Sequence, residues 1–247
     1  MTKPTIVLVP GSFSPPAAYT EIISLLRAAS FPAAAIQLPT TTKRYPLEPA
    51  TLADDAAHIR RVAETLIGQG KEVVVVCHSY GGAPTSEALV GVGVKRIIYM
   101  TSIAPKVGED IATALGGDAL SGIEVKALMT NDMKDGYMHI DASLSAGAIA
   151  NDMSWELAYE KVLLFPHHSA VSFSEPLTQA AYKEVPVSYI LCTNDLIVKP
   201  DQQRQFIDNI QSASSNKASV VEIDSGHCPM WSVPEKLRDV IISEVEK

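Results

Sequence analysis

Charged residues are scarce in this sequence, and basic ones are the scarcer kind. They make up 19% of the 247 residues, with 20 Lys and Arg against 28 Asp and Glu, which gives a net charge of −8. Proteins that follow a nucleic acid backbone need clustered basic side chains to neutralise phosphates, and the sequence contains no such cluster. We therefore expect no nucleic acid partner.

Long hydrophobic runs are also missing. The run at residues 73–77 is typical, whereas a membrane span needs about 20 apolar residues. The N-terminus is too polar for a signal peptide. Only three cysteines occur, at widely spaced positions and without a CxxC pair, which argues against a disulfide framework. These absences predict a soluble, cytoplasmic protein without a membrane partner, and they leave the oligomeric state open, with a homodimer as one option.

Apolar residues, in contrast, are plentiful at 47% of the chain. A chain of this length buries roughly 70% of the surface that its unfolded form exposes, which is enough for a hydrophobic core without cross-links. The length fits one domain, or one domain with an insertion.

Short β-branched runs alternate with amphipathic stretches along the chain. Four consecutive valines in residues 72–77 indicate a strand buried on both faces. Ser232 and Glu235 predict a capping box at the start of the last helix. Strands are expected at residues 5–9, 33–38, 72–77, 95–100, 186–192 and 218–223. This alternation predicts a doubly wound parallel sheet with helices on both faces.

The middle segment, residues 105–173, differs from the rest of the chain in composition and hydrophobic pattern. It holds four of the seven methionines and helical patches such as residues 154–164, but no strong strand signal. We interpret it as a mainly helical insertion over the carboxyl edge of the sheet, where open α/β sheets bind ligands.

The strongest chemical signal is Ser79, which lies where the valine strand turns into a helix. A serine at such a sharp turn needs small neighbours two residues away on either side, and Cys77 and Gly81 meet that need. The hydroxyl then projects above the sheet at the positive end of a helix. Serine also caps helices, but capping alone explains neither the glycine pair nor the valine run. Ser79 is thus the candidate nucleophile.

A serine nucleophile needs a histidine base and an acid that orients it. His227 follows a strand and precedes the last helix, and Asp195 follows the preceding strand, so both are expected at the carboxyl edge. The chain order Ser, Asp, His is that of the α/β-hydrolase template. Asp201 and Asp224 remain alternatives for the acid. The other histidines suit different roles. His58 lies on a solvated helix face, and His78 either packs in the turn or supports the reacting residues. His139, His167 and His168 belong to the insertion, where they could touch substrate but better suit surface or loop positions, and the evidence for a metal site is poor.

The loop after the first strand could complete the site. Its flexible backbone can turn the amide of Ser12 toward the serine oxygen, and the amide of Tyr80 follows the nucleophile directly. Together they would form a two-donor oxyanion hole. A plain glycine turn at Gly11 is the alternative reading.

At these residues the chain resembles the α/β-hydrolase superfamily, in particular a small, lid-bearing group related to plant methyl-ester hydrolases and hydroxynitrile lyases. Beyond the triad, the resemblance rests on residues 7–12, 165–169 and 189–195, on Gln203, and on the pairs at 226–227 and 234–235. It implies an α/β-hydrolase fold, with a mostly parallel six-stranded sheet that lacks the two N-terminal strands of larger members. The core would be residues 1–104 and 174–247, the lid residues 105–173, and no cofactor is implied.

Three positions depart from the group's pattern. Cys77 replaces a glycine of the serine turn, and Pro10 replaces the histidine that many relatives have before the loop glycine. The lyases have threonine and lysine where this chain has Gly11 and Cys228. Without that lysine nothing obvious stabilises departing cyanide, so lyase activity of that kind is disfavoured.

The sequence therefore predicts a serine hydrolase acting on an ester or lactone of a small, largely apolar molecule. Two alternatives keep the fold: a lyase or cyclase of a natural-product pathway, and a non-catalytic small-molecule receptor. Candidate walls of an apolar, adaptable pocket are Phe13, Tyr80, Met153, Trp155 and Trp231.

Overall fold

A single six-stranded sheet organises the computed structural model, which describes residues 3–43, 46–116 and 136–247. Every strand pair in it is parallel, and the spatial order is β2-β1-β3-β4-β7-β8. The strands are β1 (Thr5–Val9), β2 (Ala33–Ala35), β3 (Val73–His78), β4 (Arg96–Met100), β7 (Val187–Cys192) and β8 (Ser219–Ile223). The expected strands are all present, and the predicted fold class is confirmed.

Central strands are buried on both faces, which is why their sequences are apolar throughout. All six residues of β3 are buried, and so are all six of β7. The edge strand β2 is shorter than predicted. It lies beside β1 alone and ends at Ala35, and the chain then turns into a short 3-10 helix that begins at Pro39.

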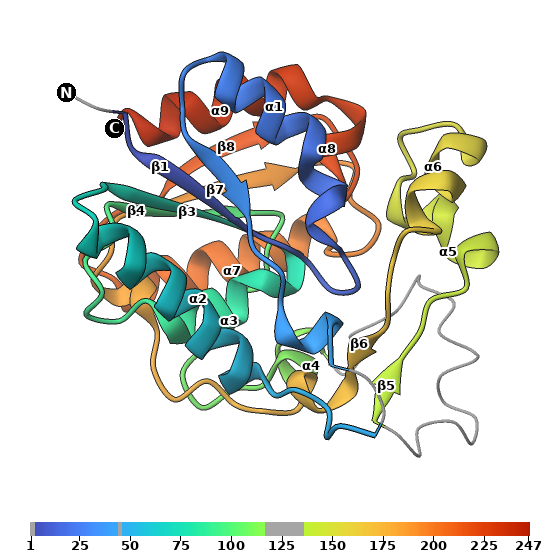
Figure 1. The fold of residues 1–247 in the computed structure, drawn as a ribbon, viewed down its shortest axis with the longest axis horizontal. Coiled ribbons are helices and arrows are strands. Elements are labelled where there is room, and N and C mark those ends of the chain that lie inside the picture. Colours follow the sequence, from blue (N-terminus) through green and yellow to red (C-terminus); the bar gives the residue numbers. More distant parts are fainter. Residues whose placement is uncertain (1–2, 44–45, 117–135) are drawn as a thin grey trace.

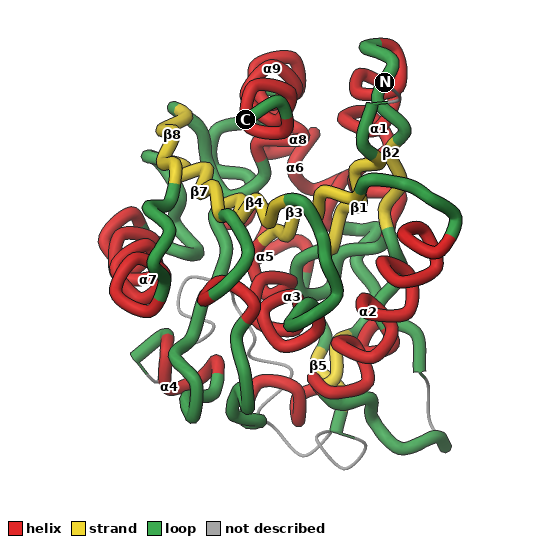
Figure 2. Tube along the Cα trace, turned by 90° about the vertical axis from the view of Figure 1, so that its left-hand side faces the viewer, coloured by secondary structure: helices red, strands yellow, loops and turns green. Residues whose placement is uncertain are grey.

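Helices cover both faces of the sheet. On one face lie α1 (Thr20–Ala28), α8 (Pro229–Ser232) and α9 (Pro234–Val245), and on the other lie α2 (Leu52–Gly68), α3 (Gly82–Ala88) and α7 (Pro200–Ala213), as Figure 1 and the edge-on view of Figure 2 show. Two separate hydrophobic clusters result, one on each side of the sheet. Short 3-10 helices span Pro16–Tyr19, Pro39–Thr41, Ser79–Gly81, Ala170–Phe173 and Ala181–Lys183.

The predicted capping box of the last helix is wrong. Helix α9 begins at Pro234, its N-cap is Val233, and no side chain caps it. Proline at the first helical position has a fixed φ suited to the helix and lacks the amide hydrogen that a cap would satisfy. Ser232 ends the preceding helix instead.

Between β4 and β7 the chain leaves the sheet. The described part of this segment contains α4 (Ile111–Ala114), β5 (Tyr137–Met138), α5 (Ala142–Ile149), α6 (Trp155–Val162) and β6 (His168–Ser169). Strands β5 and β6 pair antiparallel, which the sequence did not indicate because two residues carry no periodicity. Helices α5 and α6 stand at one end of the molecule (Figure 1). The boundaries 105 and 173 stay a prediction, and Met129 and Met133 lie outside the described residues.

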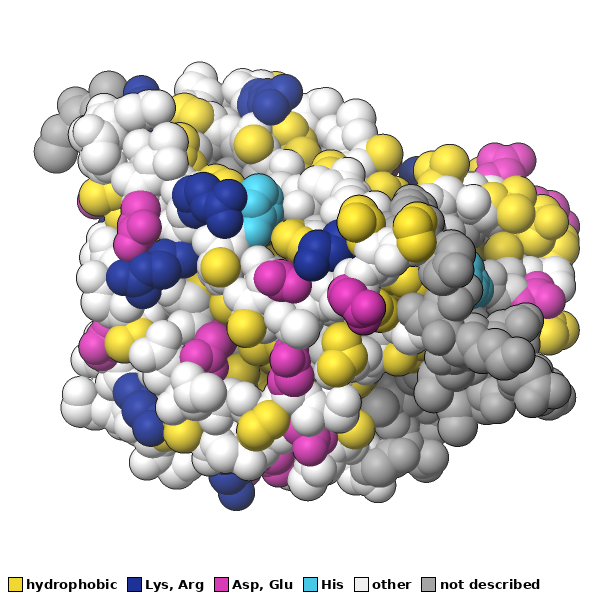
Figure 3. Space-filling view, turned by 60° about the horizontal axis from the view of Figure 1, so that its bottom comes forward, with side chains coloured by type: hydrophobic (Ala, Val, Ile, Leu, Met, Phe, Trp, Pro, Cys, Tyr) yellow, Lys and Arg dark blue, Asp and Glu magenta, His cyan; other side chains and the backbone are white. Residues whose placement is uncertain are grey.

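The surface carries both signs of charge. On the face drawn in Figure 3, acidic and basic side chains are scattered among apolar ones rather than gathered by sign. No described helix combines the length and the hydropathy that crossing a membrane requires.

Candidate active site

Ser79 occupies the tight turn between β3 and α3. Its φ of 51° lies in the left-handed region, which few residues other than glycine adopt. The chain is crowded here: a Cβ on Gly81 would lie 2.6 Å from the carbonyl oxygen of Pro10, and one on Gly82 would lie 2.3 Å from that of Ile103. The glycine pair is therefore required by the close approach of the turn to its neighbours.

The carbonyl oxygen of Ser79 accepts two hydrogen bonds from residues that follow the neighbouring strand, β4. Ser102 donates its hydroxyl hydrogen to this oxygen at 2.7 Å, and the amide of Ile103 donates to it at 3.0 Å. Both donors follow β4, so the strained turn is held by the adjacent strand as well as by its own.

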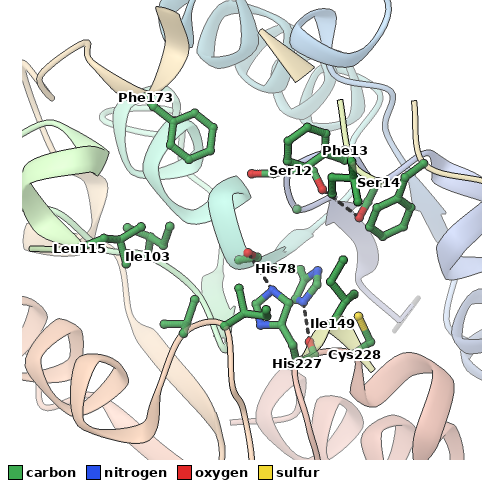
Figure 4. A pocket seen from close by; sticks show the side chains of 16 residues that line it. Ser12, Phe13, Ser14, His78, Ile103, Leu115, Ile149, Phe173, His227 and Cys228 are labelled. Carbon is green, nitrogen blue, oxygen red and sulfur yellow. Dashed lines mark hydrogen bonds between the residues drawn. The ribbon is translucent and has the colours of Figure 1, made fainter. Parts of the chain in front are cut away.

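His227 lies between Ser79 and Asp195. Its Nε2 is 3.0 Å from the Ser79 hydroxyl oxygen, and its Nδ1 is 2.7 Å from Oδ2 of Asp195 (Figure 4 shows His227 in the pocket). Asp195 is 1% exposed and His227 6%, so little water competes for these bonds. The carboxylate accepts the Nδ1 hydrogen, which leaves Nε2 free to take a proton from the serine.

Asp195 is oriented by a set of donors. Its Oδ1 accepts the amides of Ile197 at 2.7 Å and Val198 at 3.1 Å, and its Oδ2 also accepts the hydroxyl of Thr101. Thr101 was missed in the sequence, although it directly follows β4 and so had to lie at the carboxyl edge beside β7. Of the alternative acids, Asp201 lies in the first turn of α7 and Asp224 accepts a bond from Asn194.

The first loop brings Ser12 to the same cavity as Ser79. Phe13 adopts a φ of 60°, and its amide donates to Nδ1 of the buried His168 at 3.4 Å. Within the described part of the chain the Ser12 amide has no such partner, so it is available to a ligand. The oxyanion assignment to Ser12 and Tyr80 is compatible with this arrangement and stays a prediction.

A cavity that is partly open to solvent lies over Ser79, with about 550 Å³ of empty space when the open solvent at its mouth is included. No Asp, Glu, Lys or Arg is among the described residues that line it, and most of its side chains are aliphatic or aromatic. The apolar lining residues are Phe13, Ile103, Leu115, Ile140, Ile149, Phe165, Phe173, Ile197, Val198 and Cys228. Figure 4 shows Ile103 and Leu115 on one side of His227, and Ile149 and Cys228 on the other.

Of the predicted pocket walls, only Phe13 lines this cavity. Trp231 packs against Phe165, and its indole nitrogen donates to the carbonyl of Ala18 at 2.8 Å. Trp155 is 50% exposed and stacks on Tyr159. Met153 packs beside the hydrophobic cluster of the α1 face.

The side chain of Tyr80 is buried, and it is not among the residues that line the cavity. Its hydroxyl donates to Asp55 at 3.0 Å. Trp231, Met153 and Tyr80 pack against other parts of the interior and Trp155 lies at the surface, and the sequence pattern could not distinguish these positions from a pocket wall.

His167 and His168 are both buried. His167 has the loop position expected of it, whereas His168 lies in β6 and not at the surface. The ring of His168 meets those of Tyr80 and Phe173 edge to face, and burial lowers its pKa to about 3. Among the described residues no group of three or more His, Cys, Asp or Glu side chains could hold a metal ion. Both histidines therefore pack in the interior.

All three cysteines are buried and free. Burial raises the pKa of Cys77 and of Cys192 to about 12, and that of Cys228 well above its usual range. Because the thiolate is the nucleophilic form, none of them competes with Ser79.

The turn between α5 and α6 contacts the loops of the triad. Asp152 accepts the amide of Gly226 at 2.6 Å, and Asn151 donates to the carbonyl of Asn194 at 2.9 Å. Gly226 and Asn194 directly precede His227 and Asp195, so this turn is attached to both loops.

Known proteins resemble the chain over almost its whole length. A model of the alpha/beta hydrolase family matches residues 6–240. "Probable hydrolase R7" of a Phoma species is 51% identical over 245 residues, which is 98% of each chain. "Methylesterase 9" of Arabidopsis thaliana is 26% identical over 210 residues, covering 80% of each.

Solved structures agree with this likeness. A crystal structure of polyneuridine aldehyde esterase superposes with a TM-score of 0.78 at 18% identity, covering 98% of this chain and 99% of that one. The expected superfamily and its methyl-ester hydrolase relatives are confirmed. With a family model and a half-identical relative both spanning nearly all of it, the chain belongs to the alpha/beta hydrolase family and is a hydrolase.

Proposed function

We propose that the protein cleaves a carboxylic ester or lactone of a small, largely apolar molecule, with Ser79 as nucleophile, His227 as general base and acid, and Asp195 as the orienting acid. The observation that carries the proposal is the unbroken pair of hydrogen bonds, 3.0 Å from Ser79 to His227 and 2.7 Å from His227 to Asp195. Ser79 and His227 both line the cavity with apolar walls.

The reaction runs in two halves. Ser79 Oγ attacks the carbonyl carbon while Nε2 of His227 takes the hydroxyl proton, and the amides of Ser12 and Tyr80 stabilise the oxyanion. His227 then gives its proton to the leaving alkoxide, which leaves an acyl group on Ser79. Water, deprotonated by the same nitrogen, attacks the acyl carbon and releases the acid.

The cavity walls support an uncharged, apolar substrate. Apolar side chains lie on both sides of His227 in Figure 4, so both parts of an ester would meet apolar surface. A charged group there would lose hydration and would meet no Asp, Glu, Lys or Arg among the described lining residues.

The direct test is a panel of uncharged aryl and alkyl esters and lactones of graded size, assayed with the wild type and Ser79→Ala. We expect hydrolysis by the wild type and a fall of about a thousandfold or more in the variant. Ser24→Ala, an exposed serine of α1, is the control and should keep full activity. Undiminished hydrolysis by Ser79→Ala would contradict the proposal.

The same panel separates the alternatives. A lyase or cyclase would form its product with a Ser79 that reacts with no ester, and a receptor would bind a small molecule tightly without turnover. Mass spectrometry with a fluorophosphonate distinguishes these cases, since only an activated serine is labelled.

A further inference from the structure

Tyr19 and His78 form a buried hydrogen-bond string beside the triad. The amide of Gly11 lies 3.0 Å from the Tyr19 hydroxyl oxygen, which is 2.8 Å from Nδ1 of His78. On the other side of the ring, Nε2 of His78 is 2.8 Å from the carbonyl oxygen of His227. Tyr19 is 0% exposed and His78 2%, so water does not compete for these contacts.

With a neutral His78 ring, these groups allow one hydrogen-bond direction for the string. The Gly11 amide only donates and the His227 carbonyl only accepts. Tyr19 therefore accepts from Gly11 and turns its own hydrogen toward Nδ1 of His78, and the imidazole donates from Nε2. This requires a neutral His78, and burial lowers its pKa to about 3, with nearby His227 adding to the effect. Burial also raises the pKa of Tyr19 well above its usual range, so its hydroxyl stays protonated.

The string joins three segments that are far apart in the sequence. Gly11 directly precedes the proposed oxyanion donor Ser12, His78 directly precedes Ser79, and the last acceptor is the backbone of the base itself. The fit at Gly11 is close, because a Cβ there would lie 2.9 Å from Cβ of Ser79 and 3.0 Å from Nδ1 of His78. A small shift of Tyr19 or His78 would therefore move the donor loop or the base relative to the nucleophile.

The charge of His78 also matters to the base. The two imidazole rings have centroids 4.8 Å apart, and Asp195 is the carboxylate near them. In the proposed reaction His227 becomes positively charged, and a second charge at that distance would oppose this. Because Tyr19 donates to Nδ1, the neutral His78 ring carries its one hydrogen on Nε2 and donates it to the carbonyl oxygen of His227. His78 therefore fills both contacts without a positive charge.

We infer that Tyr19 and His78 are positioning residues of the proposed ester hydrolase, which hold the Ser12 amide and the His227 backbone in register with Ser79 through one directed hydrogen-bond string. This inference rests on the proposed function for its purpose, but its hydrogen-bond pattern can be tested separately. Misplacement of catalytic groups by about 1 Å can cost about a hundredfold in rate.

Tyr19→Phe tests the string, because it removes one hydroxyl and keeps the ring. Tyr99→Phe is the matched control: Tyr99 is equally buried, and its hydroxyl bonds Ser86 at 2.7 Å, away from the string. For an ester that the wild type hydrolyses, kcat of Tyr19→Phe should fall by about 10-fold to 100-fold with KM changed by less than about threefold. Tyr99→Phe should keep kcat within about twofold.

Two further readouts do not need an ester substrate. The rate at which a fluorophosphonate labels Ser79, followed by mass spectrometry, should fall in Tyr19→Phe and not in Tyr99→Phe. Nitrogen-15 NMR of the histidine rings should show His78 neutral at pH 6 with its hydrogen on Nε2. Lack of ester hydrolysis by the wild type would then count against the proposed function alone.

The positioning role is overturned if Tyr19→Phe labels and turns over within twofold of the wild type, or if Tyr99→Phe is equally slowed. It is also overturned if His78 is protonated or carries its hydrogen on Nδ1. Urea unfolding of both variants shows whether each is folded under the assay conditions.

Discussion

At the scale of single residues, the proposed triad depends on groups that take no part in the reaction. Asp195 can orient His227 because its two oxygens are held by the amides of Ile197 and Val198 and by the hydroxyl of Thr101. A carboxylate held by several donors keeps one orientation, and so does the imidazole that it binds. The orientation of Asp195 therefore depends on residues that follow two neighbouring strands, β4 and β7.

Thr101→Val should lower kcat by about tenfold, since it keeps the shape of the side chain and removes a hydrogen bond to a charged group, worth about 1.5 kcal/mol or more. Thr85→Val, at an equally buried threonine of α3, is the matched change away from Asp195 and should leave kcat within about twofold. Steady-state kinetics with one ester gives kcat for the wild type and for both variants. Equal kcat in the wild type and Thr101→Val would show that Asp195 needs no hydroxyl donor.

A second buried acid, Asp55, gives a pH prediction. It accepts hydrogen bonds from the amide and the hydroxyl of Thr40, at 3.0 and 2.7 Å, and from Tyr80 at 3.0 Å. Burial raises its pKa from 3.8 to about 7 despite these donors. The folded state then binds a proton that the unfolded state has already lost, so the contribution of Asp55 to stability falls as the pH rises from about 4 to about 7.

Asp55→Asn mimics the neutral acid and should remove this dependence. The free energy of unfolding of the wild type should therefore fall relative to the variant between pH 4 and pH 7, by on the order of 4 kcal/mol. Urea unfolding of both proteins across this range measures it. Parallel stability curves would show that Asp55 is ionised throughout.

At the scale of elements, the turn between β3 and α3 works because neighbouring strand ends approach it closely. The first turn of α3 packs against the backbone that follows β4, where a Cβ on Gly82 would lie 2.3 Å from the Ile103 carbonyl and from the Ser102 hydroxyl. Backbone cannot yield as a flexible side chain can, so the glycine is a requirement of packing.

Gly82→Ala should lower the free energy of unfolding by about 3 kcal/mol or more through overpacking. Gly68→Ala is the control: Gly68 ends α2, and a Cβ there would meet nothing within 4 Å. This variant should be unchanged or more stable by up to about 1 kcal/mol. Chemical denaturation compares the two, and similar stabilities would contradict the packing argument.

At the scale of the whole molecule, the sheet was predictable because strands buried on both faces are apolar throughout, as the valines of β3 are. The proximity of Ser79, Asp195 and His227 was predictable because the carboxyl ends of parallel strands share one edge. The strand order could not be read from periodicity, because it depends on contacts between distant segments. The walls of the cavity could not be read either, since an apolar residue such as Trp231 packs equally well against other core residues.

The hydrogen-bond string through Tyr19 likewise could not be predicted from the sequence. The sequence predicted that His78 packs in the turn or supports the reacting residues, but it did not indicate the two partners, which lie 59 and 149 residues away along the chain. Hydrogen bonds over such separations leave no local pattern, so only the folded chain reveals them.

In the proposed reaction Ser79 carries a covalent acyl intermediate. Mass spectrometry of the protein quenched during turnover of a slow aryl ester, with peptide mapping of the added acyl mass, detects this intermediate. We expect the acyl group on Ser79, and none on Ser79→Ala. Hydrolysis without any acylated protein, or an acyl group on another residue, would contradict the proposed reaction.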